Sequence, residues 1–341
     1  DQLNAEQRAT LDKLAGEYAD ELANLGVRVS NLEKKVGNLY WSGDARMRYQ
    51  DKAVDAADGW NGRMRINVKG QVNDSTYVQG RLNATMDFKE SKDDSDVQFD
   101  QLFANHDFGK AATVRLGRIP VAFGDQGGWL YGDSYGVDGA EATIHAGDKV
   151  NLTAGYGRFN TSDYGTAITD ADAFYARGAF DLNVANVGVD YIKAVGEKNT
   201  TDFAGNELIG ANLVVPVSDF RVFGEYWKNT TADDNDTAWN AGIGYGKLNL
   251  KKPGSFAIDV AYNNVEQAVY FGGTGLQTNV LSYLTSSKYK ADKVTFWNAI
   301  ADVTLQKNVY LHGEYAFDVD TEGALSDKTQ DAWTVSLNYK F

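Results

Sequence analysis

From residue 40 to the end of the chain, apolar and polar side chains alternate with a period of two. The clearest runs are 78–88, 174–180 and 309–317. Successive side chains of a strand point to opposite faces, so these runs predict strands with one apolar and one polar face. Sixteen candidate strands, most of about nine to eleven residues, lie near 42–50, 62–72, 76–88, 97–107, 111–118, 137–146, 149–158, 172–181, 184–194, 207–215, 219–229, 237–246, 255–265, 294–305, 309–318 and 331–341.

The connections between these strands alternate between short and long. Short ones fall near 73–75, 109–110, 146–148 and 306–308, and long ones near 51–61, 119–136, 159–171, 195–206 and 266–293. Short turns at one end and long loops at the other are typical of transmembrane β-barrels. We therefore predict an all-β fold over residues 40–341, a 16-stranded antiparallel transmembrane β-barrel. Weak patterning near 97–107 and 266–293 leaves open a count that differs by about two.

Residues 1–39 follow a different period. Apolar residues recur at spacings of four and three, which predicts a helix with a coiled-coil seam. The predicted seam consists of Leu11, Tyr18, Leu22, Leu25, Val29, Leu32, Val36 and Leu39. Val at the a positions with Leu at d favours two strands, and an amphipathic helix packed on its own domain is the alternative. We expect a short N-terminal α-helical coiled-coil stalk, about 45 Å long for about 30 residues.

The last nine residues, Trp333 to Phe341, resemble the closing strand of bacterial outer-membrane β-barrels, which ends on a terminal Phe. Their alternate residues would face lipid and water. We expect this strand to pair with the first one, near Gly43 to Tyr49, because a barrel leaves no open edge in a membrane. Aromatic residues at predicted strand ends would suit interfacial girdles. These are Trp41, Tyr156, Trp227, Tyr245 and Tyr262.

A helical stalk that leads into a barrel resembles the OmpM-like porins of Gram-negative-type Firmicutes, which carry an S-layer-homology (SLH) domain. The resemblance rests on Thr10 to Leu14, Val27 to Val36, Gly43 to Tyr49, Phe123 to Asp125 and the closing strand. It implies a homotrimer in the outer membrane, in contact with lipid and lipopolysaccharide, with the stalk in the periplasm. It also implies an SLH domain that grips peptidoglycan or its attached polymer, and we expect that domain upstream of Asp1.

Composition excludes several kinds of chemistry. The 341 residues carry a net charge of −14 and no cysteine, which argues against nucleic-acid binding and excludes disulfides and thiol chemistry. The three histidines, His106, His145 and His312, lie in different strand regions without a triad-like arrangement. We expect no enzyme, no cofactor and no metal site. Acidic runs at 93–96 and 233–236 lack the spacing of a calcium loop, which favours solvated loops.

The polar face of the predicted barrel changes its charge along the chain. Early strands place Arg46, Arg48, Arg63, Arg65, Lys69, Arg81 and Arg115 there, and later strands place Asp190, Glu225, Asp259, Asp302 and Glu314, with Arg177 and Arg221 as exceptions. One interpretation is a basic wall that contributes to a pore constriction. The other is polar side chains whose charges pair locally.

The loop near 118–136 is predicted to fold inward, as the equivalent loop does in general porins. Its apolar residues need a surface to pack on; they are Val121, Phe123, Trp129, Leu130 and Tyr131. Acidic residues would oppose the arginines and create a transverse field; they are Asp125, Asp133, Asp138 and Glu141. The expected function is passive diffusion of small hydrophilic solutes and ions, combined with a link to the cell wall. Two alternatives stay open, a structural tether with little channel activity and a sugar channel whose track is Trp129, Tyr131 and Tyr135.

Overall fold

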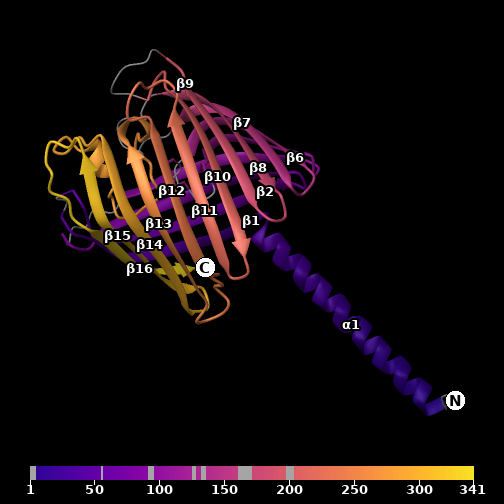
Figure 1. Cartoon of the computed structure of the whole chain (residues 1–341). Helices are drawn as coiled ribbons and strands as arrows, with labels where there is room; N and C mark the ends of the chain where they lie inside the picture. The colour runs from indigo at the N-terminus through magenta and orange to yellow at the C-terminus, as the bar shows by residue number, and fades with distance from the viewer. Residues whose placement is uncertain are drawn as a thin grey trace.

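The computed structural model describes residues 5–54, 57–90, 96–124, 128–131, 136–159, 171–196 and 203–341. It consists of a 32-residue helix, α1 (Ala5–Val36), followed by a closed antiparallel barrel (Figure 1). The strands are β1 Leu39–Asp51, β2 Gly59–Asn73, β3 Thr76–Asp87, β4 Asp96–Phe108, β5 Ala112–Pro120, β6 Gly136–Ala146, β7 Val150–Phe159, β8 Asp172–Asp181, β9 Asn186–Ala194, β10 Glu207–Val217, β11 Phe220–Asn229, β12 Thr237–Gly246, β13 Phe256–Glu266, β14 Lys293–Gln306, β15 Val309–Glu322 and β16 Ala332–Lys340.

The predicted count of sixteen strands and the antiparallel barrel are confirmed. Strand ends differ from the predicted ones by a few residues, most at β1, β2 and β15, which are longer than predicted. Between β13 and β14 the structure contains only a 3-10 turn, η1 (Gln267–Val269), and a one-turn helix, α2 (Ser282–Thr285). The weakly patterned segment near 266–293 therefore adds no strand.

The barrel closes where the two ends of the strand sequence meet. β16 pairs with β1 from Asp44↔Lys340 to Asp51↔Trp333, which confirms the predicted pairing. Gly43 and Phe341 exchange both backbone hydrogen bonds, with N···O distances of 2.7 and 3.0 Å. The Phe341 ring lies so close over Gly43 that a Cβ there would be 2.6 Å from it, so only glycine fits at this position.

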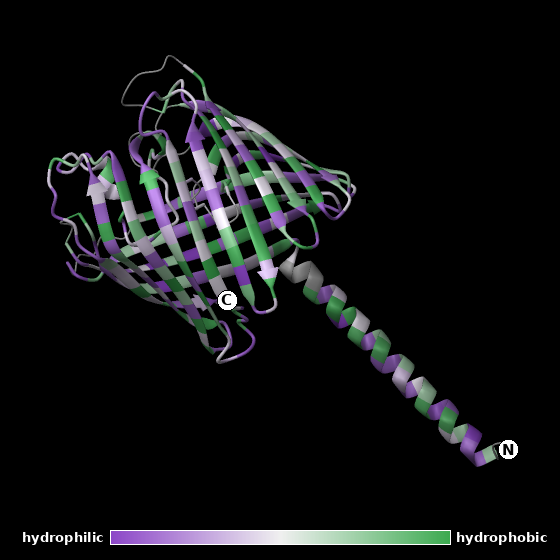
Figure 2. Ribbon diagram, in the orientation of Figure 1, coloured by the Kyte–Doolittle hydropathy of each residue, from purple (hydrophilic) through white to green (hydrophobic). Residues whose placement is uncertain are grey.

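The two faces of the barrel differ in chemistry, as the alternation predicts. Large apolar side chains such as Met47, Ile243 and Tyr245 are exposed on the outside. On β16 the polar alternates Thr334 and Ser336 are each 2% exposed and face the interior. Figure 2 shows apolar and polar residues alternating along the strands. The hydrophobic exterior and polar interior follow directly from the period of two.

Helix α1 projects away from the barrel (Figure 1). Its described seam residues are 46–68% exposed, so in this single chain the apolar seam is uncovered; they are Leu11, Tyr18, Leu22, Leu25, Val29 and Leu32. Gly37, with φ of 63°, follows the helix, and Leu39 is the first residue of β1 instead of the last of the seam. Among the residues that the structure describes, no helix is long and apolar enough to cross a membrane.

Candidate pore constriction

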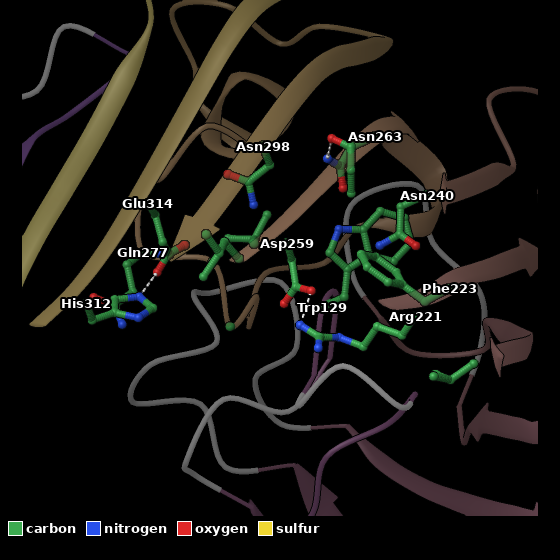
Figure 3. Close-up of a pocket in the computed structure, with 15 residues that line it drawn as sticks. Trp129, Arg221, Phe223, Asn240, Asp259, Asn263, Gln277, Asn298, His312 and Glu314 are labelled. Atoms are coloured by element: carbon green, nitrogen blue, oxygen red, sulfur yellow. Dashed lines mark hydrogen bonds and ion pairs between the residues drawn. The ribbon is translucent and has the colours of Figure 1, made fainter. Parts of the chain in front are cut away.

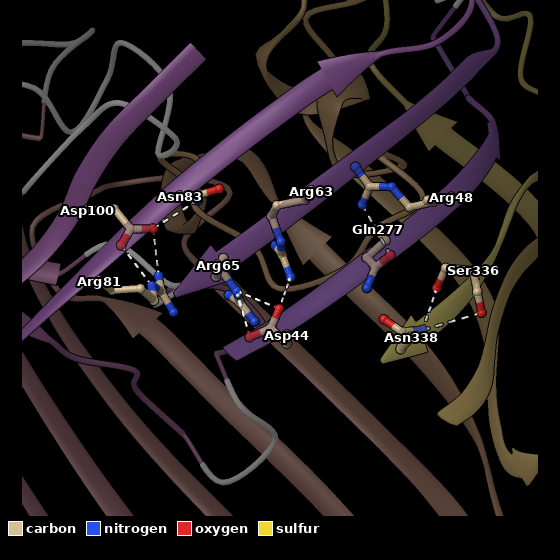
Figure 4. Close-up of polar contacts among 10 residues, drawn as sticks. All are labelled: Asp44, Arg48, Arg63, Arg65, Arg81, Asn83, Asp100, Gln277, Ser336 and Asn338. Carbon is tan, nitrogen blue, oxygen red and sulfur yellow. Dashed lines mark hydrogen bonds and ion pairs between the residues drawn. The ribbon is translucent and has the colours of Figure 1, made fainter. Parts of the chain in front are cut away.

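The arginines of the first strands have acidic partners beside them in the wall. Asp44 on β1 accepts hydrogen bonds from Arg65 Nε at 2.9 and 3.1 Å, and its Oδ1 lies 3.8 Å from Arg63 Nη2. Arg81 on β3 forms a bidentate pair with Asp100 on β4, with N···O distances of 2.7 and 2.8 Å (Figure 4). Planar two-point pairing of this kind fixes the guanidinium. This part of the wall therefore carries both signs of charge.

Sequence reasoning missed Asp44 and Asp100 as interior residues. Asp44 has the same parity as Arg46 and could have been found from the period of two. Asp100 could not, because β4 contains a β-bulge at this point: Arg81 pairs with Gln101, and Leu82 pairs with Phe99. The extra residue changes which side chains point inward, and Asp100 is 1% exposed.

Two more of the predicted residues form a pair within the wall. Arg115 on β5 lies opposite Glu141 on β6 in the register, and Arg115 Nη2 is 2.6 Å from Glu141 Oε1. Glu141 also accepts a hydrogen bond from Tyr175 Oη on β8 at 2.8 Å. Arg115 and Glu141 therefore sit side by side. Whether they contribute to a transverse field stays a prediction.

Asp138 does not join this group. It shares a face of β6 with the exposed Ile144, which is the outer face, and its carboxylate pairs with Arg118 at 2.7 and 2.9 Å. The expectation that Asp138 faces the interior is therefore corrected, because it lies an odd number of residues from Glu141 on the same regular strand. Asp125 and Asp133 lie outside the described residues.

The β5–β6 loop, residues 121–135, packs on distant strands through its described residues, 121–124 and 128–131. The ring of Phe123 lies 5.5 Å from that of Tyr175 on β8, and the ring of Tyr131 lies 4.9 Å from that of Trp227 on β11. Trp227 is fully buried. Its predicted place in an outer aromatic girdle is wrong, because Trp227 has the inward parity of β11 and supports this loop. Leu130 is also fully buried.

A pair of charged residues holds the loop backbone at Gly124. The Gly124 amide donates to Asp190 Oδ2 at 3.1 Å, and Arg177 donates to the Gly124 carbonyl at 3.4 Å. Arg177 and Asp190 pair with each other across β8 and β9 at 2.9 Å. Gly124 has φ of 81°, and a Cβ there would lie 1.9 Å from Glu225 Oε1. A side chain at this position would therefore force either the loop or the Glu225 carboxylate to move.

Burial shapes the chemistry of Tyr131, whose side chain is 4% exposed. Its hydroxyl has no hydrogen-bond partner in the described part of the chain, and burial raises the pKa of the Tyr131 phenol well above its usual range. The phenol therefore stays neutral at this position. Its ring packs, and its oxygen contributes nothing to the charge of the site.

A second loop, which sequence reasoning did not place inside, meets the first. This β13–β14 loop, residues 267–292, donates from Thr274 Oγ1 to the Trp129 carbonyl at 2.5 Å and from the Gly275 amide to the Gly128 carbonyl at 2.8 Å. Val280, Leu281, Tyr283 and Leu284 in the loop are all 2% exposed or less. These apolar residues were the available signal, the same one that predicted packing of the β5–β6 loop.

Gln277 connects the β13–β14 loop by hydrogen bonds to β1 and β15, which are distant from each other in the sequence. Its amide donates to Glu314 Oε1 on β15 at 3.1 Å, and its carbonyl accepts from Gln50 on β1 at 2.9 Å. Its side-chain oxygen accepts from Arg48 Nη1 at 3.2 Å. Arg46 lies on the same inward face of β1 and is 9% exposed. The loop is therefore fixed at β1 and β15 on one side and at the β5–β6 loop on the other.

The two loops leave cavities against the wall. One of about 380 Å³ lies between Trp129, Gly275 and Gln277 and the inner face of β10 to β15 (Figure 3). Another of about 500 Å³ extends from Gly124 along the inner face of β6 to β10. The first contains the ion pair of Arg221 with Asp259 and the side chains of His312 and Glu314, 2.8 Å apart. The interior is therefore polar and contains space on both sides of the β5–β6 loop.

Each of the three histidines forms hydrogen bonds with side chains near it in the barrel wall. His106 contacts Thr76 Oγ1 at 2.6 Å, His145 contacts Asn151 Oδ1 at 2.6 Å, and His312 lies between Asp302 and Glu314. Within the described part of the chain, no group of three or more acidic or histidine side chains is arranged to hold a metal ion.

A closed barrel of sixteen antiparallel strands with loops packed inside defines the class of the molecule: it has the fold of the bacterial porins. The structure is similar to OprB of Pseudomonas putida, with a TM-score of 0.63 and 9% identity over 93% of this chain and 96% of that one. It is also similar to a mutant of the Rh. blastica porin, with a TM-score of 0.58 and 12% identity over 89% of this chain and 100% of that one. No family model and no curated protein matches the sequence. The resemblance to SLH-domain porins stays a prediction.

Proposed function

We propose that this protein is an outer-membrane channel through which small hydrophilic solutes and ions diffuse passively. The outer face supports this proposal, since exposed apolar residues such as Leu116, Ile144 and Ile243 recur along the strands. Apolar surface on this scale belongs in lipid, and closed barrels leave no backbone edge unpaired there. The likeness to porins in fold is consistent with the same conclusion.

The contact between the two loops is the observation that carries the proposal. Thr274 and Gly275 hydrogen-bond to Trp129 and Gly128, which lie in loops that start from opposite parts of the strand order. A bridge of this kind would narrow a water-filled barrel, and cavities of about 380 and 500 Å³ lie beside it. Side chains of both charges line the wall, which favours polar, hydrated solutes over apolar ones.

Conductance across a planar lipid bilayer tests this function. Purified protein in lipid is expected to give discrete current steps in potassium chloride. A matched sample unfolded by heat before reconstitution should give none. Folded protein that inserts without producing steps would refute the channel, and the structural tether would then be the better account.

We further propose that α1 is a periplasmic stalk that joins three copies of the chain and links the barrel to the cell wall. The support is the row of apolar seam residues on α1, which are about half exposed or more in one chain. Burying such a seam against partner helices removes it from water. The proposed tether to peptidoglycan or its attached polymer acts through an SLH domain upstream of Asp1.

Deletion of residues 3–36 separates the stalk from the barrel. We expect the shortened protein to keep the heat-modifiable migration of a folded barrel and to lose mass per particle in analytical ultracentrifugation if the stalk is the main trimer contact. Loss of heat-modifiable migration would mean that α1 is a part of the barrel fold and would contradict the stalk.

A further inference from the structure

The cavity of about 380 Å³ is lined in its middle by neutral amide side chains, although the barrel interior carries many charges. Three consecutive strands, β12, β13 and β14, each contribute one asparagine: Asn240, Asn263 and Asn298. They are 4%, 2% and 4% exposed, and the β13–β14 loop adds Gln277 from the opposite side (Figure 3). The middle of the cavity is therefore lined by neutral amides, which both donate and accept hydrogen bonds.

Two polar atoms of lining residues are closed to solvent and have no hydrogen-bond partner among the residues that the structure describes. Trp129 is 3% exposed and its indole Nε1–H has no acceptor, while Asn298 Oδ1 has no donor. Buried polar groups are normally paired, because an unpaired one loses its hydration without a replacement. A hydroxyl group can accept from one and donate to the other, so a molecule in the cavity would pair each atom once its side chain turns towards the cavity.

The charged side chains of the same lining already have partners. Arg221 pairs with Asp259 and donates to the Gly246 carbonyl at 2.9 Å. Glu314 is hydrogen-bonded to His312 at 2.8 Å and accepts from the Gln277 amide at 3.1 Å. A charged solute would have to break one of these pairs to gain a counter-charge, and a neutral solute would not.

The cavity also offers an apolar surface. Trp129 and Phe223 lie near Asn240 at one end, and Gln277, His312 and Glu314 lie at the other (Figure 3). Aromatic rings beside amides suit a ligand with an apolar face and several hydroxyl groups. The volume falls at the small end of the range for small-molecule sites, about 300–1,000 Å³.

We propose that this cavity is a binding site for neutral polyhydroxylated solutes of the carbohydrate class, on the path through the channel. The proposal rests on the channel function above. It assigns Trp129 Nε1–H and Asn298 Oδ1 as the groups that hold the solute, with Asn240, Asn263 and Gln277 around it.

Block of ion current by sugar tests the site. We expect glucose or maltose, added to open channels in a bilayer, to reduce the current reversibly and in a saturable manner. A polyethylene glycol of equal hydrodynamic size should reduce it only in proportion to its concentration. Trp129→Phe keeps an aromatic ring and removes the N–H, and Asn298→Ala removes the amide. Each should weaken the block about 2- to 10-fold, the effect of one hydrogen bond.

Asn212→Ala is the matched control, because Asn212 is a buried interior asparagine on β10 that lines the other cavity. Sugar should block the current through the Asn212→Ala channel as strongly as it blocks the current through the unmodified protein. Current steps with a sugar block no stronger than that of the polymer, or an equal block in Trp129→Phe, would overturn the site and leave the channel standing. Absence of steps in the unmodified protein would overturn the channel and, with it, the site.

Discussion

Replacing Gly124 by alanine is the sharpest test of how the β5–β6 loop is held. A Cβ at Gly124 would lie 1.9 Å from Glu225 Oε1, and real Cβ contacts stay beyond 3.0 Å, so one of the two must move by about 1.1 Å. Glu225 is 3% exposed and accepts a hydrogen bond from Trp227 Nε1 at 3.0 Å, so it has little room. The loop is therefore expected to move.

The size of the effect follows from what that movement breaks. The loop would lose the hydrogen bonds of Gly124 with Asp190 and Arg177. Hydrogen bonds to charged groups contribute about 1.5–3 kcal/mol each. A left-handed backbone costs an alanine about 1–2 kcal/mol more than a glycine. We expect roughly 4 kcal/mol or more of local destabilisation and, because the loop lifts from β11, a larger single-channel conductance.

Gly147→Ala is the control for backbone strain. Gly147 has φ of 70°, but no atom of the described residues lies within 4 Å of its Cβ position, so it shares the strain without the clash. It should lower stability by about 1–2 kcal/mol and leave conductance unchanged. Bilayer recordings and thermal unfolding in detergent measure both quantities. The double variant Gly124→Ala with Glu225→Ala should return conductance towards that of Glu225→Ala alone. Equal conductance and stability in Gly124→Ala and Gly147→Ala would refute the clash.

Three further predictions concern the wall, the outer face and the loop. The first variant neutralises four arginines together: Arg46, Arg48, Arg81 and Arg115. It should shift the reversal potential in a salt gradient towards cation selectivity, and an unchanged potential would contradict the transverse field. Ile243→Arg on the outer face of β12 should destabilise the barrel in lipid by about 2–4 kcal/mol, against about 0–1 for Val72→Arg near the barrel rim; equal urea midpoints would argue against a lipid-facing surface. Tyr131→Phe removes an unpaired buried hydroxyl and should stabilise the fold by about 1–3 kcal/mol. Because the raised pKa makes the folded state hold its phenol proton, the free energy of unfolding of the unmodified protein should fall as pH rises above about 10, where the unfolded phenol ionises, and that of Tyr131→Phe should fall less. An equal alkaline loss in both proteins would contradict this.

Several arginines of the early wall are paired with neighbouring carboxylates, and this pairing weakens the field that would set ion selectivity. Asp44, Asp100 and Glu141 each lie beside an arginine on a neighbouring strand. The sequence suggested a basic early wall and an acidic later one, because it shows the sign of each side chain but not its partner. The pairing reduces the net field of the early wall, so the arginine variants test whether enough of that field reaches the path of an ion.

Two interior positions, those of Trp227 and Asp100, could not be predicted from the sequence. A tryptophan at a strand end, such as Trp227, is typical of an aromatic girdle. Only its contacts with the rings of Phe123 and Tyr131 show that it supports a loop. Asp100 points inward because of a bulge that arises from the pairing of β3 with β4. Neither position follows from composition or period, because each depends on a segment that is distant in the chain or on a shift in register.

The sequence alone determined the wall of this protein. A period of two over sixteen segments, with short and long connections in alternation, has one economical solution in a membrane, a closed antiparallel barrel. It also determined the helix before the barrel, because its heptad is local. The tertiary structure decided how the interior is filled. The β13–β14 loop enters the barrel and binds the β5–β6 loop through backbone atoms of Gly128, Trp129 and Gly275 and the side chain of Thr274. Backbone hydrogen bonds between distant loops leave no mark in the order of side chains, so the width and lining of the path follow only from the folded chain.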